Sequence, residues 1–468
     1  MKKVVHNFLY QALFQVLTII MPMITIPIVS RALGAEGIGE WGFANSIVNY
    51  FLLVAGLGMA NYAVREIAFV RNDREKLSEK FWELQLFNMF FSLTIIIVYL
   101  LFILITNQNY LYLIQTLMLL GVFFDISWLF QGVEDFKKIA VRSMILRLFS
   151  VGLIVAFVRN TDDLWIYALI LSTSNLLAAI VLWKPAFQHI HFKKVRMRAI
   201  WSHFRPALNF FILKISATIF VNLNKTLLGM MTTMVLVGYF TNALQLIVLL
   251  GTVIGALNKV MLPRMSHLQR KGNEEEFIKV LQKTIHVQLF VTIAMMFGMI
   301  AINDKLIGWF LGEDFYFVKN LIPILAPVLV FKQLHQAIAN QYLVPKDEMK
   351  FYNWTMIIGT LINVATSLIL IPRIRVYGAV FGFLIGQLFL GTSRAIVLVK
   401  KSEFRFDWIR ISKWLISGAL MLLIILITTN AMSATLLTTL IQVVIGMAIY
   451  TGLTTILKVN PVYELIKK

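Results

Sequence analysis

Long runs of apolar residues, separated by short polar connections, repeat along the whole chain. A helix of about 20 apolar residues crosses the ~30 Å hydrocarbon core of a bilayer. Fourteen runs of about this length lie at 8–30, 41–64, 81–105, 110–131, 143–159, 164–184, 206–229, 235–262, 284–302, 321–344, 352–371, 378–399, 414–430 and 435–457. The pattern therefore predicts an all-α polytopic membrane protein with fourteen transmembrane helices.

The basic residues between these runs predict which side of the membrane each connection faces. With both termini placed in the cytoplasm, 31 of the 43 Lys and Arg residues fall in inner segments, six in outer segments and six within spans. Inner loops of membrane proteins carry such an excess. We therefore expect a multi-pass protein of the inner (cytoplasmic) membrane with both termini in the cytoplasm. The net charge of +20 then reflects topology and attraction to lipid headgroups, with no nucleic-acid partner.

Six spans, a basic connection, six further spans and a final pair give the predicted domain organisation. We expect an N-terminal six-helix lobe at 1–184, a basic cytoplasmic linker at 185–205, a C-terminal six-helix lobe at 206–400, and helices 13 and 14 with the tail at 401–468. A weak internal echo pairs Glu134-Asp135-Phe136-Lys137-Lys138 with Lys346-Asp347-Glu348-Met349-Lys350, and Leu33-Gly34 with Leu228-Gly229. Because six spans is an even number, both lobes insert in the same orientation. Two parallel six-helix bundles around a central cavity are expected.

Polar side chains recur at helical spacing inside several spans. Gln11 and Gln15 share one face of the first span, and Asn242 and Gln245 share one face of the eighth. Polar groups are costly in lipid, so such residues face a cavity or a neighbouring helix. We expect these four to bind substrate in the cavity, with hydrogen bonding between helices as the alternative. The lone His335 is also expected to line the cavity.

Away from their ends, the spans contain six cations and one clear acid. The cations are Arg147, Lys214, Lys225, Lys259, Lys332 and Arg394, and the clear acid is Asp125. An unpaired cation in a low-dielectric interior is costly unless water or an anion reaches it. We therefore predict an electropositive cavity for an anionic, phosphate-bearing cargo, with Arg147, Lys214, Lys225, Lys259 and Lys332 as substrate-binding residues. For Lys259 and Arg394 the alternative is extension of the side chain to the membrane surface.

The motifs of nucleotide-driven or catalytic chemistry are missing from the sequence. It has no G-x-x-x-x-G-K-[ST] loop and no cysteine, so we expect no catalytic residues, no metal site and no cofactor. Gly56-Leu57-Gly58 lies in an apolar run, where we expect a continuous helix with the glycines serving packing. An integral-membrane polysaccharide polymerase or transferase would usually show charged residues in a sizeable outer loop, and 303–320 is a thin candidate. The sequence favours transport over enzymatic activity.

Several motifs within residues 8–400 resemble those of a known family. The run Phe124-Asp125-Ile126-Ser127-Trp128-Leu129-Phe130-Gln131-Gly132-Val133-Glu134 is similar to the span-4 signature of Wzx-type polysaccharide flippases, in the multidrug/oligosaccharidyl-lipid/polysaccharide exporter superfamily. Leu227-Leu228-Gly229, Val237-Gly238-Tyr239-Phe240 and Leu262-Pro263-Arg264-Met265-Ser266 resemble its span 7–8 block. Gln341-Tyr342-Leu343-Val344-Pro345, and Asn363 through Ile371-Pro372 to Tyr377-Gly378-Ala379, resemble its span 10–12 region.

The resemblance implies a flippase that moves undecaprenyl-pyrophosphate-linked oligosaccharide repeat units, of capsule, exopolysaccharide or O-antigen type, from the inner to the outer leaflet by alternating access. Membrane lipids are expected partners, with a polysaccharide polymerase and a chain-length regulator as further candidates. A multidrug/cation antiporter of the same superfamily is the alternative, although cationic drugs need an acidic cavity.

The resemblance also bears on energy coupling. Family members often carry acids where this chain has Asn224 and Gln387. Asp125 is then the candidate for an ion relay or for a gate. The other possible drive is the membrane potential, which is worth about 2.3 kcal/mol per charge and 100 mV. We favour the potential, because two coupling acids are replaced.

Overall fold

Helices form all the regular structure of the described residues. The computed structural model describes the backbone of residues 2–461 and their side chains, apart from the side chains at 2–17, 19, 209 and 212–214. Within these residues there is no β-strand, and the chain divides into two compact units, Met1–Thr226 and Leu227–Lys468. The predicted all-α class is therefore confirmed.

The predicted spans coincide with long apolar helices. Twelve stretches of the described residues are long and apolar enough to cross a membrane, with mean hydropathy between 1.5 and 2.7. One of them, Ile20–Val70, holds the first two predicted spans. The seventh predicted span lies in α10 (Phe204–Met231), which is not among the twelve and of which four side chains fall outside the described residues. Twelve stretches and α10 together account for the fourteen predicted spans.

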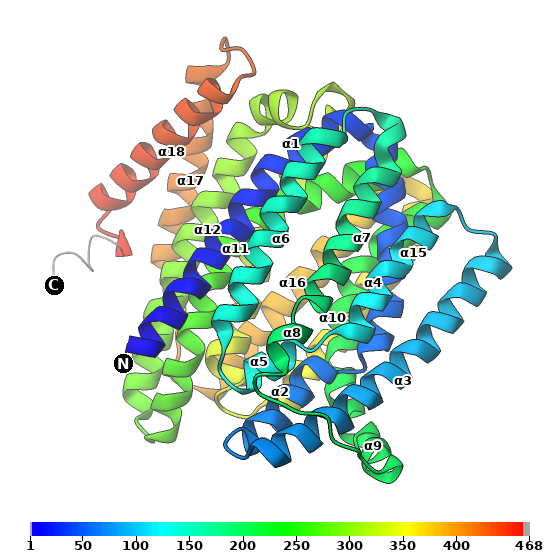
Figure 1. The fold of residues 1–468 in the computed structure, drawn as a ribbon. Helices are drawn as coiled ribbons and strands as arrows, with labels where there is room; N and C mark the ends of the chain where they lie inside the picture. The colour runs from blue at the N-terminus through cyan, green and yellow to red at the C-terminus, as the bar shows by residue number, and fades with distance from the viewer. Residues whose placement is uncertain (1, 462–468) are drawn as a thin grey trace. The chain divides into compact units, whose positions relative to one another are not determined.

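The first unit packs its long helices side by side. Its elements are α1 (Lys2–Gly56), α2 (Met59–Val70), α3 (Arg74–Thr106), α4 (Tyr110–Phe124), α5 (Ser127–Gly132), α6 (Phe136–Phe157), η1 (Thr161–Asp163), α7 (Leu164–Ile180), α8 (Trp183–Ala186), α9 (Met197–Ser202) and the start of α10. Figure 1 shows α4, α6 and α7 beside α1; each of the three contacts α1, and α7 also contacts α4 and α6. At one end of the unit, α2, α3, α5, α8 and α9 share an apolar core that includes Phe81, Trp128 and Phe130.

The second unit is built along α12 (Glu274–Phe310). Its other elements are α11 (Met234–Arg270), η2 (Glu313–Phe315), α13 (Val318–Leu325), α14 (Pro327–Ile338), the π-helical η3 (Ala339–Leu343), α15 (Met349–Ile374), α16 (Val376–Lys401), α17 (Trp408–Thr429) and α18 (Leu436–Ile456). The last two helices pack on α12. The Tyr450 hydroxyl of α18 donates to the Phe290 carbonyl of α12 (3.0 Å), and the Trp414 indole of α17 donates to the Val459 carbonyl (2.9 Å).

The two units divide inside α10. The Thr226 hydroxyl forms hydrogen bonds with the hydroxyls of Ser46 (2.9 Å) and Tyr50 (3.1 Å) in α1. These bonds hold the first part of α10 in the first unit. Residues 206–226, which we placed in the second predicted lobe, therefore group with the first compact unit. The predicted lobes were defined by transmembrane spans and not by contacts within the chain, so their boundaries remain a prediction.

Of the two pairs of similar sequence segments, one pair also has a similar backbone conformation. The two loops each turn through a left-handed acidic residue, Glu134 (φ 61°) and Asp347 (φ 56°), which lie one residue out of register in the sequence pairing. Gly34 is also left-handed (φ 66°) and kinks α1. Gly229, its predicted counterpart, is helical within α10. The first pairing therefore reflects shared local structure, whereas the second is a similarity of sequence alone.

The Gly56-Leu57-Gly58 segment interrupts a helix, so the prediction of a continuous helix there is wrong. Leu57 and Gly58 have φ of 33° and 72° and separate α1 from α2. A Cβ atom at position 58 would lie 2.6 Å from the Phe211 nitrogen in α10. Only glycine permits both this conformation and this approach of two backbones. The expected packing role is correct for Gly58, but it operates at a helix break.

Candidate functional site

A polar cleft lies within the first unit, between α1, α6 and α7. Its volume is about 420 Å³. The polar residues that line it are Thr25 of α1, Arg142, Ser143, Arg147 and Ser150 of α6, and Tyr167, Ser174 and Asn175 of α7. No carboxylate is among the lining residues, so two guanidinium groups set the charge of the cleft. We call it the arginine cleft.

Arg147, one of the predicted substrate-binding cations, lines the arginine cleft with an exposed side chain. Its guanidinium donates a hydrogen bond to the Thr18 hydroxyl of α1 (3.0 Å). The hydroxyls of Ser150 and Ser174 lie 2.5 Å apart and join α6 to α7 in the cleft wall. Exposed guanidinium N–H groups beside hydroxyls suit phosphate oxygens and sugar hydroxyls.

Arg142 is a cleft residue that the sequence analysis missed. Hydropathy placed the start of the fifth span at 143, so Arg142 counted as part of an inner loop. The helix begins at Phe136, which brings Arg142 into its second turn. The guanidinium donates to the Ala178 carbonyl of α7 and to the Ser143 hydroxyl (3.2 Å). Its Nε is buried and has no acceptor among the described residues.

Asp125 lies at a break in the fourth span, between α4 and α5. One carboxylate oxygen accepts from the Ser127 backbone N–H (3.0 Å) and the other from the Ser127 hydroxyl (3.1 Å). Both oxygens of the acid are thus bonded to Ser127, the first residue of α5. Asp125 lines a smaller cavity of about 180 Å³ with Asn88 and Trp128, and does not line the arginine cleft.

Side chains satisfy the carbonyl groups that the break exposes. Asn88 donates to the Val122 carbonyl (2.8 Å), Gln85 to the Phe123 carbonyl (3.0 Å) and Trp183 to the Phe124 carbonyl (2.9 Å). A backbone interruption inside a membrane is stable only when such groups find partners in the protein. The helix break at Asp125 is therefore a stable feature of the fold, in which side chains satisfy the free carbonyl groups.

Arg394 is buried, so the alternative of extension to the membrane surface is wrong. Its side chain is 1% exposed. It donates to the Thr355 hydroxyl (3.1 Å), to the His335 carbonyl (3.1 Å) and ring (3.3 Å), and to the Tyr352 carbonyl (3.3 Å). The guanidinium also lies 4.5 Å from the centroid of the Tyr352 ring. These contacts join α14, α15 and α16.

His335 belongs to the same buried cluster, where it contacts protein groups on both ring nitrogens. Its Nε2 lies 2.9 Å from the Gln387 Oε1, and its Nδ1 faces Arg394. The side chain is 6% exposed. The expectation that His335 lines a cavity is therefore wrong, because protein partners take both nitrogens.

The other predicted residues divide between the two units. Lys225 is half-buried in the first unit. In the second unit Asn242 is buried, Lys332 is half-buried, and Gln245 and Lys259 are exposed. The side chains of Gln11, Gln15 and Lys214 lie outside the described residues. Arg147 is thus the predicted cation that lines a defined cleft, and its cleft partner is Arg142.

Comparisons with known proteins agree with this all-helical architecture. The family model described as polysaccharide biosynthesis protein matches residues 4–269. A relative from Escherichia coli (strain K12), named as an O-antigen transporter, is 28% identical over 184 residues, which are 38% of this chain and 43% of that protein. A Shigella dysenteriae relative of the same name is 20% identical and covers 81% of this chain and 95% of its own.

Among solved structures, the lipid II flippase MurJ in an inward closed conformation shares the fold. It aligns with a TM-score of 0.76 at 17% sequence identity, over 96% of this chain and 98% of its own. The E. coli match spans less than half of that relative, whereas the Shigella and MurJ matches span nearly the whole of theirs.

Proposed function

Because this chain belongs to the polysaccharide biosynthesis protein family, as its resemblance to Wzx-type flippases predicted, we propose that it is a flippase for lipid-linked oligosaccharides. The substrate is an undecaprenyl-pyrophosphate-linked repeat unit of capsule, exopolysaccharide or O-antigen type. Alternating access carries it from the inner to the outer leaflet of the cytoplasmic membrane. The arginine cleft, with two guanidinium groups and no carboxylate, is the observation that carries the proposal.

The proposed substrate fits the chemistry of the cleft. Arg142 and Arg147 bind the diphosphate, because guanidinium groups form strong charge-assisted hydrogen bonds with phosphate oxygens. Ser143, Ser174 and Asn175 face the same space and bind sugar hydroxyls. The remaining predicted residues, Gln11, Gln15, Lys214, Lys225, Asn242, Gln245, Lys259 and Lys332, are proposed to line the path of the substrate through the central cavity.

Asp125 is proposed to act as a structural gate residue, and the membrane potential as the drive. Both carboxylate oxygens of Asp125 accept hydrogen bonds from Ser127 of α5, and the acid lines a different cavity from the arginine cleft. This supports a conformational role over an ion relay. The proposed partners are membrane lipids, a polysaccharide polymerase and a chain-length regulator.

The test measures glycan export in cells that lack their own flippase and depend on this protein. Arg142→Ala and Arg147→Ala should each reduce export about tenfold or more, since one charge-assisted hydrogen bond to a charged group is worth about 1.5–3 kcal/mol. Lys225→Ala should abolish export, and Lys225→Arg should restore part of it. Protein levels should stay near normal in all of them.

The matched control is Arg159→Ala, which removes an exposed arginine just beyond the end of α6. It should export normally. Normal export by both cleft variants would contradict the proposed anion site. Loss of cationic dye extrusion with intact glycan export would instead favour the drug antiporter.

A further inference from the structure

The connection between α8 and α10 is fixed along the first turns of α3. The His191 backbone N–H donates to the Ser78 hydroxyl (3.1 Å), and the Trp82 indole donates to the His191 carbonyl (3.0 Å). Lys193 pairs with Glu79 of α3 (3.0 Å). We call residues 192–204 the interfacial segment. Its position relative to α3 is therefore set by specific bonds.

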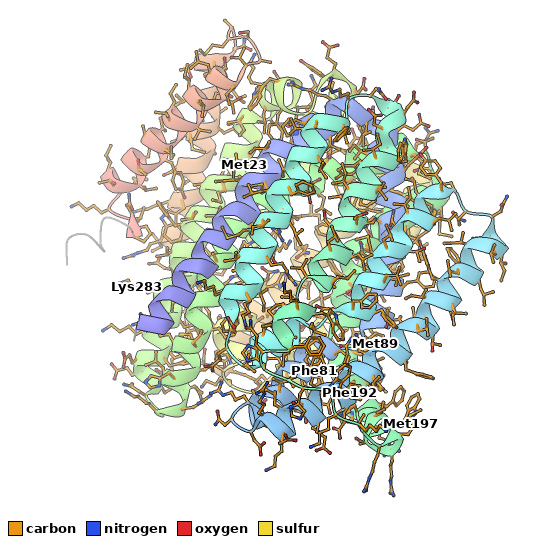
Figure 2. All side chains as sticks on the ribbon, viewed as in Figure 1. Met23, Phe81, Met89, Phe192, Met197 and Lys283 are labelled. Atoms are coloured by element: carbon orange, nitrogen blue, oxygen red, sulfur yellow. The ribbon has the colours of Figure 1, made fainter. Side chains whose placement is uncertain are left out.

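Large apolar side chains of the interfacial segment lie on its surface. Phe192 is 70% exposed and Met197 is 66% exposed. Figure 2 shows Met197 at the margin of the first unit, where α9 projects, whereas Phe81 lies among the helices. Contiguous exposed apolar side chains of this size mark an interaction surface.

The contacts of Trp201 indicate how deep this surface lies in the membrane. Its ring packs edge-on against Phe90 of α3, with 5.0 Å between the centroids. Phe90 belongs to an exposed apolar stripe with helical spacing along α3, namely Leu86, Phe90, Leu93, Ile97, Leu101 and Leu104. In a membrane-spanning helix such a stripe faces lipid. Trp201 therefore lies beside one end of a lipid-facing stripe, where aromatic side chains of membrane proteins collect.

Unpaired positive charge accompanies the apolar side chains. From Leu164 to Asn273 the chain contains no Asp or Glu. Lys194, Arg196 and Arg198 are exposed, and none forms an ion pair with a described residue. Lys193, in contrast, is neutralised by Glu75 and Glu79. Three uncompensated cations thus lie next to an aromatic anchor at the edge of the hydrocarbon region.

We infer that the interfacial segment binds the phosphate headgroups of anionic lipids in the leaflet it faces, with Lys194, Arg196 and Arg198 as the headgroup contacts and Phe192, Met197 and Trp201 inserted beside them. Basic residues next to interfacial aromatic side chains bind anionic membranes in this manner. His203 lies near the end of the segment, and its ring bonds to the Tyr62 hydroxyl of α2 (2.6 Å) and to Glu83 of α3 (3.3 Å). Lipid binding therefore fixes the depth at which α10 begins.

The experiment uses the absence of cysteine from the chain. The full-length Met197→Cys protein is labelled with a fluorophore and reconstituted in phosphatidylcholine vesicles with or without phosphatidylglycerol. Nitroxide lipids labelled near the headgroup should quench the probe more than lipids labelled deep in the acyl chain. Phosphatidylglycerol should increase the quenching, and high salt should reverse that increase because it screens surface charge.

Two controls isolate the contribution of the segment. A Glu275→Cys probe, on the exposed hairpin between α11 and α12, should show no such depth dependence. The variant with Lys194, Arg196 and Arg198 replaced by Gln should lose most of the phosphatidylglycerol response. The matched variant with Lys271, Lys279 and Lys283 replaced by Gln removes three exposed lysines of that hairpin and should keep it.

A Met197 probe that is quenched no more than the Glu275 probe would overturn the inference and leave the face for a protein partner. An equal phosphatidylglycerol response in both triple variants would also overturn it. The readout needs no transport, so it stands or falls separately from the proposed flippase activity.

Discussion

Two helices of this protein, α6 in the first unit and α16 in the second, carry arginine within a span, and the two sites differ in access. Arg147 is exposed in a cleft of about 420 Å³. Arg394 is 1% exposed, and its hydrogen-bond acceptors are a hydroxyl, two carbonyls and the His335 ring. An intramembrane cation has room for a ligand only where space remains around it. Elsewhere the same guanidinium joins helices.

The buried site also explains the arrangement of His335 and Gln387. Arg394 carries only N–H donors, so the His335 Nδ1 that it contacts must be an acceptor. The proton then resides on Nε2, which donates to the Gln387 Oε1. A glutamine at 387 therefore completes a network of neutral groups around one fixed positive charge. Its role in the second unit is structural.

The largest expected effect comes from Arg394. Arg394→Met should lower the free energy of unfolding by about 3 kcal/mol, because it leaves several buried acceptors without a donor. Arg394→Lys should recover little, since an ammonium group cannot reproduce the planar fork of contacts. The measurement is unfolding of the purified protein in detergent.

Arg147→Met provides the matched comparison. Its exposed side chain should change the unfolding free energy by no more than about 0.5 kcal/mol. Equal destabilisation by the two Met variants would contradict the distinction between an open and an enclosed arginine.

The contrast between the exposed Arg147 and the buried Arg394 also shows how far the sequence could predict the structure. The spans follow from apolar runs, because lipid imposes a minimum length on each helix. Arg147 was found through its charge in a span, but Arg142 was missed because hydropathy sets the start of a helix only approximately. The burial of Arg394 could not be predicted, since it depends on Thr355, Tyr352 and His335, which come from two other helices.

Helix breaks show the same limit. The apolar run around Gly56-Leu57-Gly58 resembles an uninterrupted span, and only the approach of Phe211 reveals why the chain turns there. The break at Asp125 was marked by a family motif, yet its physical basis lies in Gln85, Asn88 and Trp183, which are distant in sequence. The contacts that explain each break come from residues distant in sequence, so the local sequence pattern cannot reveal them.

A smaller effect on stability is expected at Asp125, an intramembrane acid whose two oxygens accept hydrogen bonds from Ser127. Asp125→Ala should cost about 1–2 kcal/mol of stability because it removes both hydrogen bonds to Ser127, and Asp125→Asn should cost less because one accepting oxygen remains. Flipping in vesicles should respond to an imposed voltage without a pH or sodium gradient, in the wild type and in Asp125→Asn. Strict dependence on a proton gradient that disappears in Asp125→Asn would make Asp125 the coupling residue.

The smallest expected effect on stability concerns His203, a buried base that can be neutral or protonated. The side chain is 3% exposed between Tyr62 and Glu83. Burial lowers the pKa of His203, with Lys80 adding to the decrease and Glu83 opposing it. The ordinary histidine pKa is about 6.5, so the unfolded chain takes up the proton at a higher pH than the folded protein does. Stability should therefore fall as the pH falls below about 6.5, and level off below the folded-state pKa.

His203→Gln removes this titration while it keeps polar groups beside Tyr62 and Glu83. The difference in unfolding temperature between wild type and variant should change as the pH is lowered from neutral to mildly acidic values. A difference that stays constant over this interval would show that folding leaves the pKa of His203 unchanged. Its enclosure would then have no effect on its charge, as at Arg394, and the contrast between fixed and optional buried charges would not hold.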